Sequence, residues 1–268
     1  MTLSLFDRPA VLFLPASNPR AIAKARDSAA DLVVLDLEDA VKPEDKESAR
    51  AAAVEAVAVE WPMPVAIRIN GTGSDLHGHD VVAMMHSKVE LIVVPRTESK
   101  QDLSFVRNQT GRPIAAMIET AKGVLAAREI ANEAVALIAG TNDLAADLRL
   151  PHGAGRAPLQ MALQSVVLTA RGAGIAAFDG VFNRLDDKQG FAAEAAEGRG
   201  LGFDGKSLIH PDQIDPCNRA FGPTEREIER ARKLVDAFSG GAERFEDQMI
   251  ERMHVEAARR TLERAGQA

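Results

Sequence analysis

Short apolar runs alternate with longer Ala-rich segments along most of the chain. The runs cover residues 11–14, 32–35, 65–69, 91–94, 114–118, 136–139, 175–178 and, more weakly, 203–209. Each is too short for a buried helix and is bounded by polar, Gly or Pro residues, a pattern typical of parallel strands covered on both faces. Segments of helical composition and spacing lie between them, at 21–30, 46–59, 121–132 and 159–171. Eight strand-then-helix units in about 220 residues predict an α/β fold of the (β/α)₈ TIM barrel type, with a doubly wound open sheet as the alternative.

The pattern changes beyond Pro223. Residues 224–238 predict a charged amphipathic helix, with Thr224 as its N-cap and Glu227 as the capping-box partner. The Ser239-Gly240-Gly241 stretch predicts a flexible joint, and a second helical segment follows from about 247 to 265. We therefore expect a barrel over 1–222 with its active site at the C-terminal rim. A helical extension over 223–268 would serve as a lid or an oligomerisation arm, or would be a frayed tail.

Composition narrows the class of protein. Hydrophobic residues make up 46% of the chain, which permits a sizeable core, and no apolar run approaches the ~20 residues of a membrane span. The apolar stretch near the N-terminus contains Pro15 and lacks a preceding basic region, so it predicts a first strand rather than a signal peptide. A single cysteine, Cys217, gives neither an internal disulfide nor a Cys-based metal cluster, and we expect a packed thiol. A cytoplasmic location is the simplest account.

The charge balance limits the partners. A formal net charge of -7 does not favour nucleic acid or an anionic membrane surface, and aromatic residues at 4% without tyrosine do not favour base stacking. An anionic small substrate would therefore need local arginines or a metal ion.

Acids and arginines recur where the predicted strands end. Asp36, Glu38 and Asp39 follow the second run, and Arg68, Glu119, Asp143, Asp179 and Lys206 end or follow later ones. Since all strand ends of a barrel face one rim, where active sites are built, we expect a functional rim. Polar loops alone would place Lys, Ser and Gln there as readily.

Glu119 and Asp143 are 143 − 119 = 24 residues apart, about the length of one βα unit, so they would stand side by side on the rim. Two such carboxylates repel each other unless a cation lies between them, and Mg²⁺ typically takes one or two protein carboxylates. No His pair or Cys cluster offers a better Zn²⁺ site. His77, His79 and His86 do not share one helical face, so we expect surface or loop positions for them. The alternative for the two acids is helix capping.

Arg68 is the natural anchor for a substrate carboxylate, because its planar guanidinium can bind two oxygens at once. The alternative is a structural ion pair with Glu38 or Asp36 on the neighbouring strand end. Asp36, Glu38 and Asp39 are also candidates for a second layer that orients metal-bound waters.

Seven ordered motifs carry a family resemblance. They read LFLPASNPR, VVLDLEDAV, AIRINGTGSDLHGHD, VVPRTES, MIETAKGVLAAREIA, AGTNDLAADL and GFDGKSLIHPDQI. The set, from about residue 9 to 238, resembles the citrate lyase β-subunit-like branch of the HpcH/HpaI aldolase superfamily. The resemblance implies a TIM barrel, usually a homotrimer or larger homo-oligomer, that cleaves or forms a carbon–carbon bond in a CoA thioester.

The resemblance also implies the chemistry. Substrates of the citryl-CoA, malyl-CoA or citramalyl-CoA type would give an acyl-CoA and a 2-oxo acid, and the superfamily includes related thioesterases. The metal carboxylates fall on Glu119 and Asp143, for Mg²⁺ with Mn²⁺ as a second candidate ion. Arg68 and Glu119 would contact the substrate. Arg20, Lys24, Arg26 and Arg96 are candidates for binding the polyanionic CoA, with ordinary solvated surface as the alternative.

The C-terminal motif departs from the family. Related lyases carry G-x-M-[IV]-D-x-P, whose Asp reaches a neighbouring subunit's site. Here Asp247 replaces the Gly, Glu251 the Asp and Met253 the Pro. Either Glu251 is the catalytic acid that protonates the acyl-CoA enolate, or the protein has drifted to another substrate. Two rivals remain open: a class II pyruvate aldolase without CoA, and a weakened lyase subunit acting within a complex.

Overall fold

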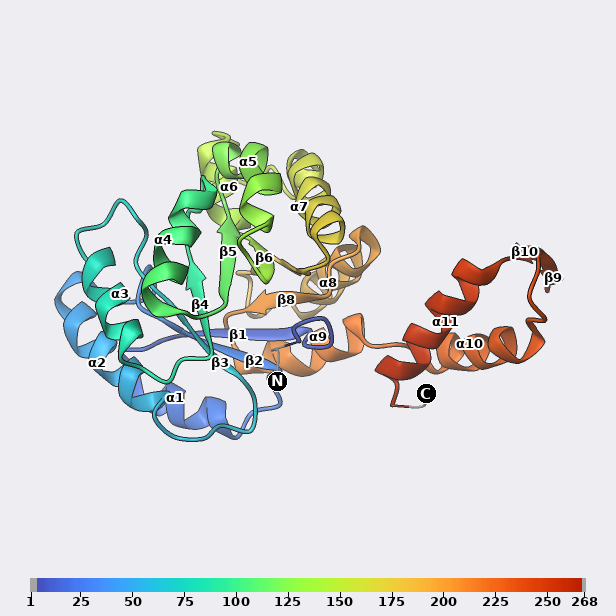
Figure 1. Ribbon diagram of the computed structural model, residues 1–268, viewed down its shortest axis with the longest axis horizontal. Helices are drawn as coiled ribbons and strands as arrows, with labels where there is room; N and C mark the ends of the chain where they lie inside the picture. Colours follow the sequence, from blue (N-terminus) through green and yellow to red (C-terminus); the bar gives the residue numbers. More distant parts are fainter. Residues whose placement is uncertain (1–3, 267–268) are drawn as a thin grey trace. The chain divides into compact units, whose positions relative to one another are not determined.

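Eight parallel strands close into a barrel in the computed structural model, which describes residues 4–266 (Figure 1). The strands are β1 Ala10–Pro15, β2 Leu32–Asp36, β3 Val65–Arg68, β4 Leu91–Val94, β5 Ile114–Ile118, β6 Ala136–Ala139, β7 Ala176–Asp179 and β8 Gly205–Leu208. Each pairs with its neighbour in sequence, and β8 pairs with β1. The (β/α)₈ prediction is confirmed, and the doubly wound sheet is excluded because that sheet would have open edges.

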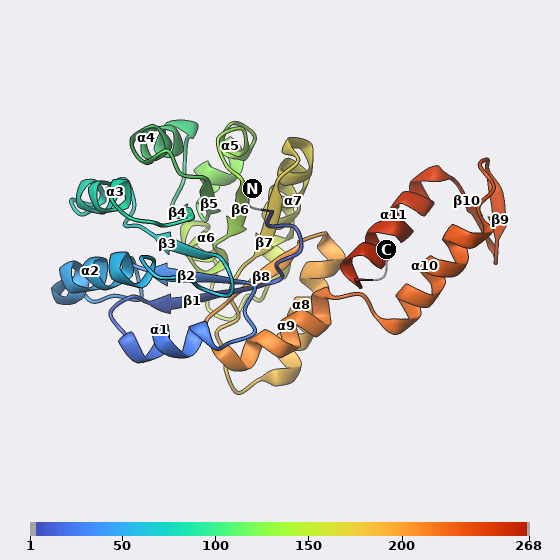
Figure 2. The same cartoon turned by 60° about the horizontal axis from the view of Figure 1, so that its bottom comes forward.

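Helices surround the strands, as Figure 2 shows from a second direction. They are α1 Pro19–Arg26, α2 Lys46–Ala56, α3 His77–Met85, α4 Lys100–Thr110, α5 Ala121–Ala131, α6 Thr141–Asp147, α7 Gln160–Ala173, α8 Lys188–Leu201 and α9 Ile214–Phe221. The barrel unit ends at Cys217, and a second compact unit begins at Asn218.

Cys217 is buried, and burial raises the pKa of its thiol to about 12. The cysteine is therefore a packed thiol, as predicted.

Alternate residues of β1–β7 point into the barrel and fill it. The inner cluster combines large and small side chains: Val11, Leu32, Val34, Ala66, Leu91, Val93, Ala115, Met117, Ala136, Ile138, Ala176 and Phe178. A strand places every second residue on the same face, so this set fixes which later residue of each strand faces inward. Stepping on by two residues gives Asp36, Arg68, Glu119 and Gly140 above the packed core.

The C-terminal unit has a small core of its own. Helices α10 Glu225–Ala237 and α11 Arg252–Arg264 pack together with a hairpin of β9 Glu243–Phe245 and β10 Gln248–Ile250. Thr224 caps α10 in a capping box with Glu227, as predicted. The expected helix start near 247 is wrong: Glu246 adopts a left-handed turn (φ 54°), residues 248–250 are extended, and Glu251 is the N-cap of α11.

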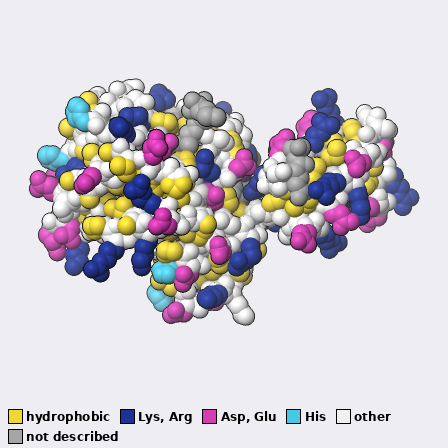
Figure 3. Space-filling model, turned by 90° about the horizontal axis from the view of Figure 1, so that it is seen from below, with side chains coloured by type: hydrophobic (Ala, Val, Ile, Leu, Met, Phe, Trp, Pro, Cys, Tyr) yellow, Lys and Arg dark blue, Asp and Glu magenta, His cyan; other side chains and the backbone are white. Residues whose placement is uncertain are grey.

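Acidic and basic side chains are interspersed over the barrel on the face in Figure 3. Within residues 4–266, no helix is both long and apolar enough to cross a bilayer.

Candidate active site

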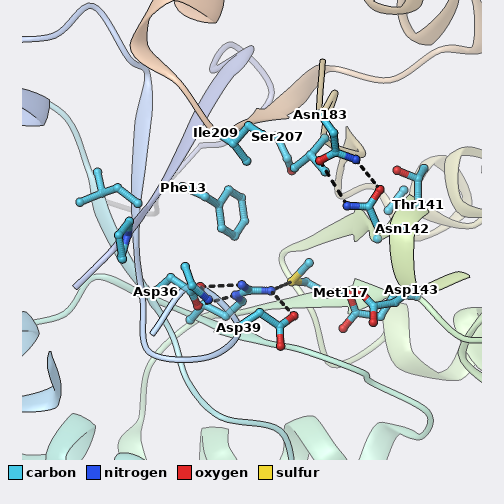
Figure 4. Close-up of a pocket in the computed structure, with 18 residues that line it drawn as sticks. Phe13, Asp36, Asp39, Met117, Thr141, Asn142, Asp143, Asn183, Ser207 and Ile209 are labelled. Atoms are coloured by element: carbon cyan, nitrogen blue, oxygen red, sulfur yellow. Dashed lines mark hydrogen bonds and ion pairs between the residues drawn. The ribbon is translucent and has the colours of Figure 1, made fainter. Parts of the chain in front are cut away.

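A cavity of about 360 Å³ opens where the strands end at the C-terminal rim (Figure 4). Its walls combine acids, amides and apolar groups: Phe13, Leu14, Pro15, Asp36, Asp39, Ala40, Arg68, Met117, Glu119, Ala139, Gly140, Thr141, Asn142, Asp143, Val181, Asn183, Ser207 and Ile209. Five of the predicted rim residues therefore meet in one space, namely Asp36, Asp39, Arg68, Glu119 and Asp143. Glu251 belongs to the separate C-terminal unit, so its role in the site stays a prediction.

Arg68 is held by two carboxylates. Its Nε and Nη2 each lie 2.6 Å from an oxygen of Asp36, and its Nη1 lies 2.8 Å from Oε2 of Glu38. Asp39 is farther away, at 4.0 Å from Nη1. Burial opposes the charged guanidinium, but Asp36, Glu38 and Glu119 outweigh it and raise the pKa of Arg68 above its ordinary value. The structural ion pair considered from the sequence is therefore present, yet the same guanidinium also faces the cavity.

Asp36 lines the cavity and forms the ion pair with Arg68 that was considered from the sequence, whereas its second predicted role, orienting metal-bound waters, stays a prediction. Its side chain accepts hydrogen bonds from the backbone N–H groups of Glu38 (2.9 Å) and Ala40 (3.0 Å), in addition to those from Arg68. These bonds fold the loop after β2 around a fixed carboxylate. The signal available in the sequence was an acid at the inward-facing position next to the arginine of the neighbouring strand.

Lys46 fastens the same loop from behind. Its ammonium donates to the backbone oxygens of Leu37 and Glu38 (both 2.7 Å) and to Oδ1 of Asn70 (2.8 Å). This lysine thereby ties the loop after β2 to the loop after β3. Arg68 is the last residue of β3. Burial raises the pKa of Glu38 to about 7, against the opposing charge of Arg68.

His77 corrects one expectation. It is buried rather than at the surface, and its Nδ1 lies 2.8 Å from the backbone oxygen of Asn70. Asp80, also buried, accepts from Asn70 and from Arg50, so the β3 loop is braced by hydrogen bonds on both sides. His77 contributes to this loop support and is not part of the cavity lining.

Glu119 and Asp143 come from adjacent βα units. Glu119 follows β5, is 2% exposed, and accepts a hydrogen bond from the backbone N–H of Arg96. Asp143 lies in the first turn of α6, and the Nη1 of Arg96 is 3.6 Å from its Oδ1. Arg96 itself has a left-handed backbone (φ 45°).

Glu119 is a buried carboxyl with a raised pKa. Burial raises the pKa of this carboxyl to about 7, Asp143 and Asp39 add to the shift, and the Arg96 N–H and Arg68 oppose it. The cavity lining holds four carboxylates and one guanidinium.

Within residues 4–266 no group of three or more His, Cys, Asp or Glu side chains forms a metal cluster. Two carboxylates completed by water and substrate oxygens are what Mg²⁺ uses, so the residues present fit that ion.

Gly140 is required by the close approach of Glu119. A Cβ at position 140 would overlap the carboxylate and the Cβ of Glu119. We expect Gly140→Ala to displace this carboxylate and to weaken Mg²⁺ binding by at least about tenfold in calorimetric titration, because Mg²⁺ requires near-octahedral geometry and depends on the support of its ligands. Gly172→Ala, where a Cβ meets nothing within 4 Å, is the matched control. Equal Mg²⁺ affinities for the two variants would contradict the role of Gly140.

Two further strand-end residues do not face the cavity. Lys206 is fully buried and lies 3.0 Å from Asp179 and 2.7 Å from Glu194 of α8. Asp179 also pairs with Arg156 at 2.7 Å. Both residues sit one position away from the inward-facing set, so they point toward the helices and stabilise the β7–β8 seam.

Of the basic residues considered for CoA, Arg20 and Lys24 both lie in α1 and are exposed. Arg26 is already engaged, since it stacks on Trp61 and donates to the backbone oxygen of Glu60 at 2.7 Å. Arg96 is occupied by Asp143, as described above.

Known proteins are similar to this chain in sequence and in fold. The family model described as HpcH/HpaI aldolase/citrate lyase matches residues 9–211. A (3S)-malyl-CoA thioesterase of Cereibacter sphaeroides is 36% identical, with 95% of this chain and 93% of that protein covered. The citrate lyase subunit beta of Leuconostoc mesenteroides subsp. cremoris is 33% identical over 96% of this chain and 93% of its own length.

Solved structures of related proteins are similar to this chain as well. The protein CitE of Mycobacterium tuberculosis, in complex with magnesium, acetoacetate and coenzyme A, superposes with a TM-score of 0.87 at 32% identity, covering 98% of this chain and all of that one. The citrate lyase beta subunit of M. tuberculosis, complexed with oxaloacetate and magnesium, has a TM-score of 0.75 at 31% identity, with 82% of this chain and 100% of that chain covered. The predicted enzyme class, a carbon–carbon lyase, is thereby confirmed, and the chain belongs to the HpcH/HpaI aldolase/citrate lyase family.

Proposed function

We propose that this protein cleaves the carbon–carbon bond of a hydroxy-acid CoA thioester in a Mg²⁺-dependent reaction, giving an acyl-CoA and a 2-oxo acid. The observation that carries the proposal is the meeting of Arg68, Glu119 and Asp143 in one cavity at the barrel rim. The magnesium and coenzyme A bound by the related CitE support the choice of ion and thioester. Mn²⁺ is the alternative ion.

Arg68 binds the carboxylate of the oxo-acid part. Asp36 occupies its Nε and Nη2, so the substrate uses the Nη1/Nη2 edge, near the Sδ of Met117 at 3.7 Å. Because Asp36 fixes the plane of the guanidinium, the bound carboxylate has a fixed orientation, which aligns the bond to be broken.

Glu119 and Asp143 would hold the metal ion. When bound, the ion supplies positive charge next to the oxygen on which negative charge develops as the bond breaks. The backbone N–H of Arg96 fixes one oxygen of Glu119, which limits the ways in which that carboxylate can turn. The apolar side chains of Phe13 and Met117 exclude water from the reacting centre.

Glu251 is the proposed acid that delivers a proton to the departing acyl-CoA enolate. Its backbone N–H donates to Nδ1 of His254 at 3.0 Å, so the residue is fixed at the start of α11. Glu251→Asp tests this role: a large loss of lyase activity supports a working glutamate, and a large gain indicates an eroded family aspartate. Glu251→Gln separates proton delivery from packing.

The decisive experiment is an assay of the purified protein on citryl-CoA, malyl-CoA, citramalyl-CoA and simple oxo-acid aldols, each with Mg²⁺, Mn²⁺ or EDTA. Turnover of a CoA ester with release of a 2-oxo acid supports the proposal. Turnover that EDTA leaves unchanged rejects the metal mechanism, and turnover restricted to free aldols supports the pyruvate aldolase alternative. No turnover of any ester supports the weakened subunit.

Hydrolysis of the thioester is a second candidate, favoured by the 36% identity to (3S)-malyl-CoA thioesterase. Free thiol measured with a chromogenic disulfide separates the two reactions, because cleavage of the carbon–carbon bond keeps the thioester intact. The proposed assembly is a homotrimer or larger homo-oligomer in the cytoplasm, and light scattering of the purified protein tests the assembly.

Mg²⁺ binding is expected to depend on pH through Glu119. The pKa of this carboxyl in the metal-free fold is about 7, above its ordinary value of 4.5, so the fold without metal loses stability as the pH rises through this range. Below pH 7 the ion competes with a proton, and its affinity falls by up to about tenfold per pH unit. The rise in Tm on adding Mg²⁺ should therefore be larger at pH 8 than at pH 6. A rise in Tm that is the same at both values contradicts this account. In metal-free Glu119→Gln, the part of the pH dependence of Tm that comes from this carboxyl should be absent.

A further inference from the structure

Arg96 contacts both predicted ligands of Mg²⁺, one through its backbone and one through its side chain. Its backbone N–H donates to Glu119, and its Nη1 lies 3.6 Å from Oδ1 of Asp143. We propose that Arg96 is a positioning residue whose two parts act on Mg²⁺ binding in opposite directions. The backbone holds Glu119 ready for the ion, whereas the guanidinium takes the ion's place at Asp143 until the ion displaces it. This inference rests on the proposed function and specifies how its metal site is built.

The backbone of Arg96 is held in an unfavourable conformation. Its φ of 45° lies in the left-handed region, where a Cβ crowds the carbonyl oxygen that follows. The neighbouring residues impose this turn. Pro95 has a restricted φ, and the buried Thr97 donates from its N–H to the backbone oxygen of Met117 at 3.1 Å and from its Oγ1 to the end of β4 at 3.0 Å. Such conformations persist where the surrounding structure over-determines them, and here the turn directs the N–H of Arg96 at Glu119.

The guanidinium of Arg96 is a movable counter-ion for Asp143. The two side chains are 52% and 41% exposed, so water screens their attraction and the contact is weak. Glu98 is another acid near Arg96, but the hydrogen bond from Lys122, at 3.0 Å, is the largest influence that lowers the pKa of Glu98. A cation beside Asp143 repels Mg²⁺, which needs the same carboxylate. Since the side chain of Arg96 is half-exposed, it can turn into solvent when the ion binds.

Arg68, the other arginine of the site, differs in both respects. Its side chain is only 11% exposed, and two of its nitrogens each lie 2.6 Å from an oxygen of Asp36. Arg68 therefore stays in place when the ion binds, whereas Arg96 exchanges with the ion.

Calorimetric titration of two variants with Mg²⁺ tests the role of the guanidinium. Arg96→Gln removes the charge and Arg96→Lys keeps it, and both side chains are unbranched at Cβ. We expect the glutamine variant to bind Mg²⁺ about two- to fivefold more tightly than the lysine variant at low ionic strength, with a ratio close to one at high salt. Equal affinities at low salt, or weaker binding by the glutamine variant, overturn the exchange of the guanidinium with the ion.

A second pair of variants tests the backbone, with no charge at position 96 in either member. Asparagine adopts the left-handed region readily, whereas the β-branched valine strongly disfavours it. Arg96→Val should bind Mg²⁺ at least about tenfold more weakly than Arg96→Asn, because the N–H turns away from Glu119 and leaves that ligand unsupported. Arg96→Ala should fall between the two, and it replaces the valine variant if that variant does not fold. Equal affinities of these neutral variants overturn the role of the backbone.

The Tm of the metal-free variants separates positioning from a general effect on the fold. Arg96→Gln and Arg96→Lys should have similar Tm values and different Mg²⁺ affinities, whereas a purely structural role requires the affinity to follow the Tm. A parent protein that binds Mg²⁺ together with unchanged ratios in both pairs overturns this inference and leaves the proposed function standing. A parent protein that neither binds Mg²⁺ nor requires it for turnover rejects the metal site of the proposed function.

Discussion

Replacement of Glu119 by glutamine is expected to abolish detectable Mg²⁺ binding and to lower kcat/KM by about 10³-fold or more, because loss of the ion removes several kcal/mol of transition-state stabilisation. The stability of the folded, metal-free protein should not decrease. Glu119 is almost fully buried and its raised pKa marks a carboxylate that the metal-free fold does not stabilise. The free energy of unfolding of metal-free Glu119→Gln at pH 8 should equal or exceed that of the parent.

The two measurements separate a metal ligand from a structural acid. Asp143→Asn should show the same loss of Mg²⁺ binding, while Glu98→Gln removes a surface carboxylate, paired with Lys122 at 3.0 Å, and should leave Mg²⁺ affinity unchanged. Retention of Mg²⁺ affinity in Glu119→Gln would reject the assignment of the metal site. Loss of stability together with activity would indicate that Glu119 serves the fold.

Arg68→Met is expected to lower both activity and stability. Removing the guanidinium leaves Asp36 and Glu38 buried without a counter-charge, which typically destabilises a protein by about 3–5 kcal/mol. It also removes the anchor for the substrate carboxylate, so kcat/KM should fall by about 10³-fold. Denaturant unfolding and steady-state kinetics measure the two effects independently.

Arg68→Lys and the double variant Arg68→Met/Asp36→Asn distinguish the causes. The lysine keeps the charge but cannot bind Asp36 through two nitrogens while presenting a second edge to substrate, so most of the activity loss should persist. The double variant removes one uncompensated charge and should recover part of the stability without recovering activity. Full activity in Arg68→Lys would show that charge alone suffices, and an inactive but fully stable Arg68→Met would remove the structural half of this account.

Much of the barrel could be predicted from the chain because its strands are continuous apolar runs. The seven clearest runs match the observed strands to within one or two residues. The eighth, Gly205–Leu208, was the weakest because Lys206 interrupts it, and only the buried contacts with Asp179 and Glu194 show why a lysine is tolerated there. The hairpin of the C-terminal unit was missed because a helical period was extended over three residues, Gln248–Ile250, that pair with β9.

The site was predictable where spacing along the chain sets spacing on the rim. One βα unit brings Glu119 and Asp143 to the same cavity, as the sequence argument required. The double role of Arg68 could not be resolved in this way, because ion pairing with Asp36 and a free edge toward the cavity coexist on one side chain. Burial of His77 depends on how the β3 loop folds back over α3, which no short sequence pattern records.

The two-residue alternation of the strands divides the rim positions into an inward-facing and an outward-facing set, which matters for redesign of the site. Positions that continue the inward set, such as 13 and 119, alter the cavity when they change, and 36, 68 and 140 among them also support the fold. Positions 179 and 206, one step away, affect only the packing of the barrel. A mutant library confined to the inward positions outside the Arg68–Asp36 ion pair and Gly140 would sample altered cavities on an intact scaffold. The same number of substitutions spread over all strand ends would lose many members to unfolding before any substrate was tried.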